Sequence, residues 1–136
     1  MKNKKKEKQM QTKEIKNFKM NDEVYSLRRK VINMIYEVKN HIEDLPRVEL
    51  RIGEARCQDN LLGLASRGKR QLWITKKAID MSEDALRNIV YHELVHAIFG
   101  FKHDDKCPLM QPTLKTILNK EDCLKHLLKY KNYKGE

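Results

Sequence analysis

The residues best suited to chemistry are two histidines and a glutamate in the segment His92-Glu93-Leu94-Val95-His96. Residues four apart lie on one face of an α-helix, so the imidazoles of His92 and His96 can converge on one metal ion. Glu93 points about 100° away from His92, within reach of a water on that ion. Zinc would lower the pKa of this water, and Glu93 would pass its proton to the departing amine of a cleaved peptide. The spacing therefore predicts a zinc-dependent metallopeptidase with Glu93 as general base. The alternative is a chance match on an amphipathic helix.

A third zinc ligand is expected after the helix, because catalytic zinc usually has three protein ligands and one open position. Gly100 can adopt a positive φ angle that reverses the chain, and His103 follows it by three residues. His103 is therefore the predicted third ligand. Asp104 and Asp105 are alternatives as oxygen ligands, although a solvated acidic turn also explains them.

The helix that must position these residues has clear start and stop signals. Ser82 is a good N-cap, Glu83 and Asp84 suit the positive end of the helix dipole, and Gly100 suits the C-terminal end. A helix from about Glu83 to Phe99 is predicted, with a broad apolar face.

The rest of the chain predicts a single α+β domain over residues 23–136. Apolar residues recur every three or four positions from Val24 to Leu45, which indicates a helix ended by Pro46. Short strands are predicted at residues 48–52, 61–66 and 71–75, giving a small mixed sheet. Asn119 can cap a C-terminal closing helix that runs to Lys129, with Asp122 in the capping-box position.

Residues 1–22 are predicted to be a basic flexible tail. Residues 1–20 contain eight lysines and two glutamates, and so carry six of the ten net positive charges. Such a segment is a solubilising tail or a weak binding site for an anionic partner such as nucleic acid. No apolar run could span a membrane and no signal peptide is visible, which predicts a cytoplasmic protein. Three widely spaced cysteines also suit reduced thiols.

These residues resemble the metzincins, and most closely the catalytic domain of matrixin-type peptidases. The resemblance runs from about Val48 to Tyr130, and its core is His92-Glu93-x-x-His96 followed by Gly100-x-x-His103-Asp104. The segment 107–113 is similar to the methionine turn beneath the zinc in that family, which makes Met110 its counterpart. One residue is inserted between His96 and Gly100 relative to the metzincin spacing. A helix extended or bulged by one residue would accommodate it.

The resemblance implies a zincin-like fold, zinc on His92, His96 and His103, and a peptide or protein substrate. It also implies that the strand containing Leu64, Ala65 and Ser66 is the edge strand that pairs with an extended substrate. An ordinary edge strand is the alternative.

Other interpretations stay open. Cys107, Cys123 and His126 could form a second metal site, although buried cysteines more often serve as small hydrophobic residues. The alternative functions are a zinc-stabilised binding module without catalysis and a metal-dependent hydrolase that acts on nucleic acid.

Overall fold

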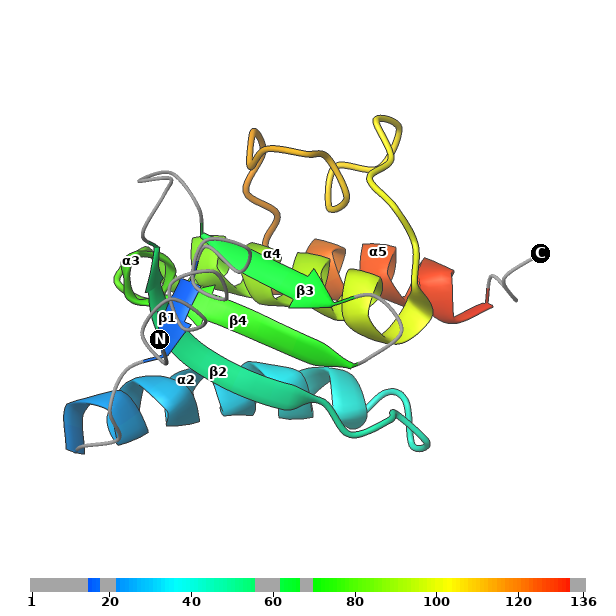
Figure 1. Ribbon diagram of the computed structural model, residues 1–136. Helices are drawn as coiled ribbons and strands as arrows, with labels where there is room; N and C mark the ends of the chain where they lie inside the picture. The colour runs from blue at the N-terminus through cyan, green and yellow to red at the C-terminus, as the bar shows by residue number, and fades with distance from the viewer. Residues whose placement is uncertain (1–14, 18–21, 56–61, 67–69, 133–136) are drawn as a thin grey trace, which may run out of the picture.

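Four strands form one mixed sheet in the order β1-β2-β4-β3, with helices packed against it (Figure 1). The computed structural model describes residues 15–17, 22–55, 62–66 and 70–132. The elements are β1 (Ile15–Asn17), α2 (Asp22–Lys39), β2 (Glu49–Ala55), β3 (Gly63–Ser66), β4 (Gln71–Thr75), α3 (Lys76–Ile79), α4 (Glu83–Leu94), the π-helix η1 (Val95–Phe99) and α5 (Lys120–Asn132). The structure is therefore a small mixed α+β domain, and this fold class agrees with the sequence prediction.

The centre of the sheet is the pair β2 and β4, which run parallel. Leu50 lies opposite Leu72 and Ile52 lies opposite Ile74, and all four side chains are buried. β1 pairs antiparallel with β2 at one edge, and β3 pairs antiparallel with β4 at the other. The mixed sheet predicted from the alternating segments is confirmed, and β3 is an edge strand.

The core lies between the sheet and helices α2, α4 and α5. Side chains from each helix are fully or almost fully buried, because each helix turns one apolar stripe inward. The main contributions are Val31 and Val38 from α2, Leu86, Val90 and Leu94 from α4, and Cys123 and Leu127 from α5. This core holds α4 in place as the rigid base of the site.

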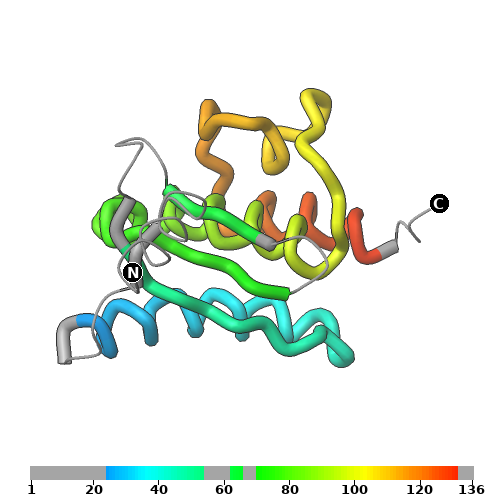
Figure 2. Tube along the Cα trace, viewed as in Figure 1, coloured from blue at the N-terminus to red at the C-terminus, as the bar shows by residue number. Residues whose placement is uncertain are grey.

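A long loop connects η1 to α5. Figure 2 shows it leaving the end of η1, standing above α4 and returning to the start of α5. This loop spans residues 100–119 and contains the third predicted ligand and the predicted methionine turn.

The first helix ends earlier than predicted. α2 ends at Lys39, not near Leu45, and the chain continues in turns in which the amide of His41 donates to the carbonyl of Val38 over 2.9 Å. Ile42 and Leu45 are nevertheless 3% and 8% exposed. The helix-like spacing of apolar residues reflects which side chains are buried. Here the turns after α2 bury Ile42 and Leu45 as a longer helix would.

The predicted boundary between a tail at 1–22 and a domain at 23–136 falls one residue after the start of α2. β1 lies within the predicted tail and pairs with β2. Residues 1–14 and 18–21 of that tail lie outside the described residues.

The short helix α3 was not predicted. Its signal is Thr75, whose hydroxyl accepts a hydrogen bond from the amide of Ala78 as an N-cap. Among the described residues, no helix is long and apolar enough to cross a bilayer.

Candidate functional site

The site is built on the helical segment that the sequence predicted from Glu83 to Phe99. Ser82 accepts a hydrogen bond from the amide of Ala85 over 3.2 Å, which confirms the N-cap. α4 runs to Leu94 and continues as the π-helix η1 to Phe99, where Gly100 ends it with a φ angle of 73°. The segment thus has the predicted bounds.

The wider turn of η1 places one additional residue between His96 and Gly100. A π-helix closes its hydrogen bonds over five residues instead of four, so an inserted residue fits without breaking the helix. A π-helical segment is thus present where the sequence predicted an extended or bulged helix.

Three histidines come together at the end of this segment. The ligand nitrogens of His92, His96 and His103 all lie within 4.8 Å of one another. His92 and His96 are partly buried, whereas His103 is exposed on the loop. The ring centroid of His103 lies 5.1 Å from that of His92 and 4.8 Å from that of His96. The helix and the loop that follows it therefore form one cluster that could hold a metal ion.

Backbone carbonyls orient the two helical imidazoles. His92 Nδ1 lies 2.7 Å from the carbonyl oxygen of Leu109, and His96 Nδ1 lies 2.6 Å from that of Phe101. A carbonyl oxygen can only accept, so each Nδ1–H donates and each Nε2 presents its lone pair. The two Nε2 atoms face each other at 3.1 Å. Two acceptor nitrogens thus point toward one place.

His92 is held in its neutral form. Burial lowers its pKa to about 4, the neighbouring His96 and His103 add to this change, and the bond to the Leu109 carbonyl opposes it. A neutral imidazole is the form that binds metals.

The loop that supplies the Leu109 carbonyl is closed by its own hydrogen bonds. The amide of Asp104 donates to the carbonyl of Met110 over 2.8 Å, and the amide of Met110 donates to the carbonyl of Cys107 over 3.0 Å. Met110, the predicted methionine of this turn, has no exposed surface. The turn therefore fixes the start of the loop, next to His103, to the buried Met110 in the middle of the loop.

The aspartates considered as alternative ligands have other contacts. A carboxylate oxygen of Asp104 accepts from the amide of Lys106 over 2.9 Å, which is a solvated turn interaction. Asp105 is exposed, and its carbonyl accepts from the side chain of Gln111. Neither carboxylate belongs to the histidine cluster.

Glu93 lies beside the histidines in a buried position. It is 8% exposed, and burial raises its pKa to about 8. Its side chain packs against β3 at Gly63, where an added Cβ would come within 3.0 Å of Glu93 Oε2. Gly63 therefore suits this close approach, because a Cβ here would be in tighter than ordinary contact with the Glu93 side chain.

A cavity of about 400 Å³ opens between α4, β3 and the loop. His92 and Glu93 line it together with Gly63, and most of its other walls are apolar: Leu62, Ile89, Pro108, Leu109, Pro112 and Leu114. A site of this volume and lining can take a side chain or a small ligand. The predicted general base and one predicted ligand share this cavity.

The predicted substrate strand is next to this cavity. β3 contains Leu64, Ala65 and Ser66, which pair with Trp73, Leu72 and Gln71 of β4. Within the described part of the chain, its other side is an edge of the sheet. Backbone groups at such an edge can pair with an extended peptide.

Sequence reasoning missed two residues of the site, Gly63 and Asn88. The Asn88 amide group donates to the carbonyl of Leu118 over 2.8 Å, and the Leu118 amide donates back to Asn88 Oδ1 over 3.1 Å. Asn88 also lines the cavity. A buried asparagine inside a helix, one turn before His92, was the signal that could have found it.

The alternative cysteine site is only partly assembled. Cys107 Sγ lies 3.9 Å from His126 Nδ1. Cys123 is fully buried, and burial above all raises the pKa of its thiol to about 12. This raised pKa disfavours the thiolate that metal binding requires.

Neither the protein-family models nor the curated proteins include a match to this chain.

Proposed function

We propose that this protein is a zinc-dependent metallopeptidase. His92, His96 and His103 hold the zinc ion, and Glu93 acts as the general base and then the general acid. The metzincin-like spacing of these residues supports the same assignment.

The observation that carries the proposal is the facing pair of Nε2 atoms. Zinc bonds to histidine nitrogen at about 2.0–2.1 Å in tetrahedral geometry, which puts two ligand nitrogens about 3.3 Å apart. His92 and His96 have this pair at 3.1 Å. Their Nδ1–H groups are fixed by the carbonyls of Leu109 and Phe101, as metal-binding histidines usually are.

The identity of the metal follows from the donor set. Three imidazoles and no carboxylate or thiolate form the cluster among the described residues. Imidazole nitrogen suits zinc, and three protein ligands leave a position for water or substrate. Bound zinc would supply a Lewis acid that polarises a water and the carbonyl under attack.

Glu93 supplies the proton transfers. It is adjacent to a ligand but is not part of the ligand cluster, and it faces the same cavity as His92. The positive charge of a bound zinc ion would lower the pKa of Glu93 again, and the carboxylate could then take a proton from the attacking water and deliver it to the amine of the leaving peptide. Because Gly63 has no side chain, the Glu93 carboxylate can lie close to β3, where a substrate backbone would lie.

A peptide substrate is favoured by the strand and the cavity together. The open edge of β3 offers backbone donors and acceptors to an extended chain. The cavity beside Glu93 offers apolar walls to one of its side chains. A zinc-stabilised binding module would need neither a buried carboxylate nor a cavity beside the metal.

The test is cleavage of a peptide library by zinc-loaded protein, followed by mass spectrometry. Wild type should cleave, and Glu93→Gln should lower kcat by about 10²–10⁴-fold while binding the same amount of zinc. The matched control is Glu121→Gln, which neutralises an exposed carboxylate in the first turn of α5 and should leave kcat unchanged. Wild-type protein that binds zinc and cleaves nothing would favour the binding module, and undiminished cleavage by Glu93→Gln would refute the role of this residue.

A further inference from the structure

A second groove lies between α2 and the segment that leads into β2. Its volume is about 380 Å³, and it shares no residue with the cavity at the histidines. Its lining residues are Arg28, Ile32, Ile35, Tyr36, Lys39, Leu45, Pro46, Arg47, Val48 and Leu50. The groove is therefore a separate surface of the domain.

The charge of this groove has one sign. Arg28, Lys39 and Arg47 line it, and among the residues that the structure describes no acidic side chain does. Arg28 is anchored, because its guanidinium donates to the carbonyl of Leu50. Lys39 and Arg47 are exposed. Three cations beside one hollow favour an anionic ligand.

The groove also carries an exposed aromatic ring. Tyr36 is 54% exposed, and Lys39 Nζ lies 5.8 Å from the centre of its ring. Tyr25 is 57% exposed and lies eleven residues earlier, about three turns or 16 Å along the same face of α2. Arg29, also exposed, lies one turn after Tyr25 on that face. Aromatic rings and cations therefore alternate along one surface.

The acidic residue near the C-terminal end of α2, Glu37, does not reduce the positive charge of this surface. Glu37 turns toward α4, where both of its carboxylate oxygens accept from the guanidinium of Arg87. The side of α2 that lines the groove therefore keeps its positive charge.

We propose that this groove binds single-stranded nucleic acid. Arg28, Lys39 and Arg47 contact the phosphates, and Tyr36 stacks on a base. Cationic grooves with exposed aromatic rings bind single strands in this way, because every base has a flat face and the backbone charge is uniform.

Two other anionic partners fit less well. A membrane surface would require an apolar helix face, but the apolar face of α2 is buried in the core through Val24, Val31, Met34 and Val38. An acidic peptide could pair with the cations, but acidic side chains offer no flat ring to stack on Tyr36.

The test is fluorescence anisotropy with a labelled fifteen-nucleotide single strand and the full chain. Tyr36→Ala should weaken binding about tenfold, because it removes the ring on which one base would stack. Tyr36→Phe keeps the ring and should bind as wild type does. Arg47→Ser should weaken binding and lower the slope of log K against log salt by about 0.7, the value for one phosphate contact with a single strand.

The matched control is Lys115→Ser, which removes one exposed charge from the distant loop 100–119 and should have a smaller effect than Arg47→Ser. The lysine-rich residues 1–20 are identical in all variants, so their contribution to affinity is the same. Ultraviolet cross-linking of a 5-iodouridine strand should modify a peptide of α2. Cross-links confined to residues 1–20, unchanged affinity of Tyr36→Ala, or equal binding of poly-glutamate would each overturn the proposal.

Discussion

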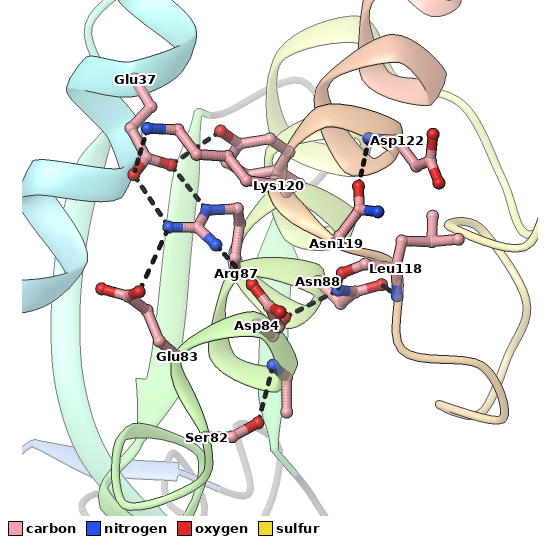
Figure 3. A network of polar contacts seen from close by, with 12 residues as sticks. Glu37, Ser82, Glu83, Asp84, Arg87, Asn88, Leu118, Asn119, Lys120 and Asp122 are labelled. Atoms are coloured by element: carbon pink, nitrogen blue, oxygen red, sulfur yellow. Dashed lines mark hydrogen bonds and ion pairs between the residues drawn. The ribbon is translucent and has the colours of Figure 1, made fainter.

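Helix α4 contributes residues to two polar clusters, and these clusters differ in how their members pair. In the first, Arg87 and Tyr91 meet Glu37 of α2, and every contact joins a donor to an acceptor (Figure 3). In the second, His92, His96 and His103 bring three bases of the same kind together, and two acceptor nitrogens face each other at 3.1 Å. The first cluster is complete within the chain and stabilises it, whereas the second has the geometry of a ligand set.

The ionisation of the two clusters differs in the same way. Burial alone would raise the pKa of Glu37, but hydrogen bonds from Arg87 and Tyr91 and the charges of Arg87 and Lys120 lower it overall. The bond to Glu37 raises the pKa of Arg87. Both groups therefore keep their charges, and these charges hold α2 to α4. Among the described residues Glu93 meets no such counter-charge, and burial alone raises its pKa. A buried carboxyl group of this kind adds little stability and is typical of functional sites.

The most direct way to break the first cluster is Arg87→Met. The Arg87 side chain is 4% exposed, and its loss leaves the partly buried Glu37 without its main partner. We expect the free energy of unfolding to fall by about 3 kcal/mol, measured by urea denaturation. Arg29→Met on the exposed side of α2 is the control and should change it by less than about 0.5 kcal/mol. An equally small effect of Arg87→Met would remove the distinction between the two clusters.

Asn88→Ala should have a smaller effect on stability and a local effect on the site. It leaves both the amide and the carbonyl of Leu118 without their side-chain partner, at a cost of about 2 kcal/mol. Hydrogen exchange should increase in the loop 100–119. Asn119→Ala removes only the N-cap of α5 and should cost about 1 kcal/mol. If the loop exchanges equally in both variants, Asn88 does not hold the cavity wall.

The smallest predicted effect is the contribution of Glu37 to the pH dependence of the free energy of unfolding. Because its pKa is lower in the folded protein than in the unfolded chain, its stabilisation is present above the unfolded value of 4.5. It is lost as the pH falls through the folded value. Unfolding free energies measured between pH 7 and pH 3 should therefore fall toward acid. The fall should be smaller in Glu37→Gln, and equal falls in both proteins would contradict this assignment.

The ligand helix was predictable because its information is local. His92, Glu93 and His96 lie within five residues, and Ser82 and Gly100 mark the ends of the segment. Even the π-helical turn could be anticipated from the one-residue insertion before Gly100. A helical period determines which side chains share a face, so the convergence of His92 and His96 followed from spacing alone.

The rest of the site depends on contacts between distant parts of the chain. Gly63 and Glu93 are thirty residues apart, as are Asn88 and Leu118. No local pattern predicts which glycine will meet a carboxylate across a sheet edge. The predicted end of α2 was wrong for a related reason, since Ile42 and Leu45 are buried although they lie in turns and not in a helix.

The central claim is that the histidine cluster is a zinc site, and zinc stoichiometry tests it most directly. Elemental analysis of purified wild type should give one zinc per chain, and added zinc at a hundredfold excess over Kd should stabilise the fold by about 2.7 kcal/mol. His92→Ala should lose the metal and the stabilisation, His103→Ala should bind zinc more weakly, and Asp104→Ala should match wild type. Carefully prepared wild type without zinc, or His92→Ala with unchanged zinc content, would contradict the account.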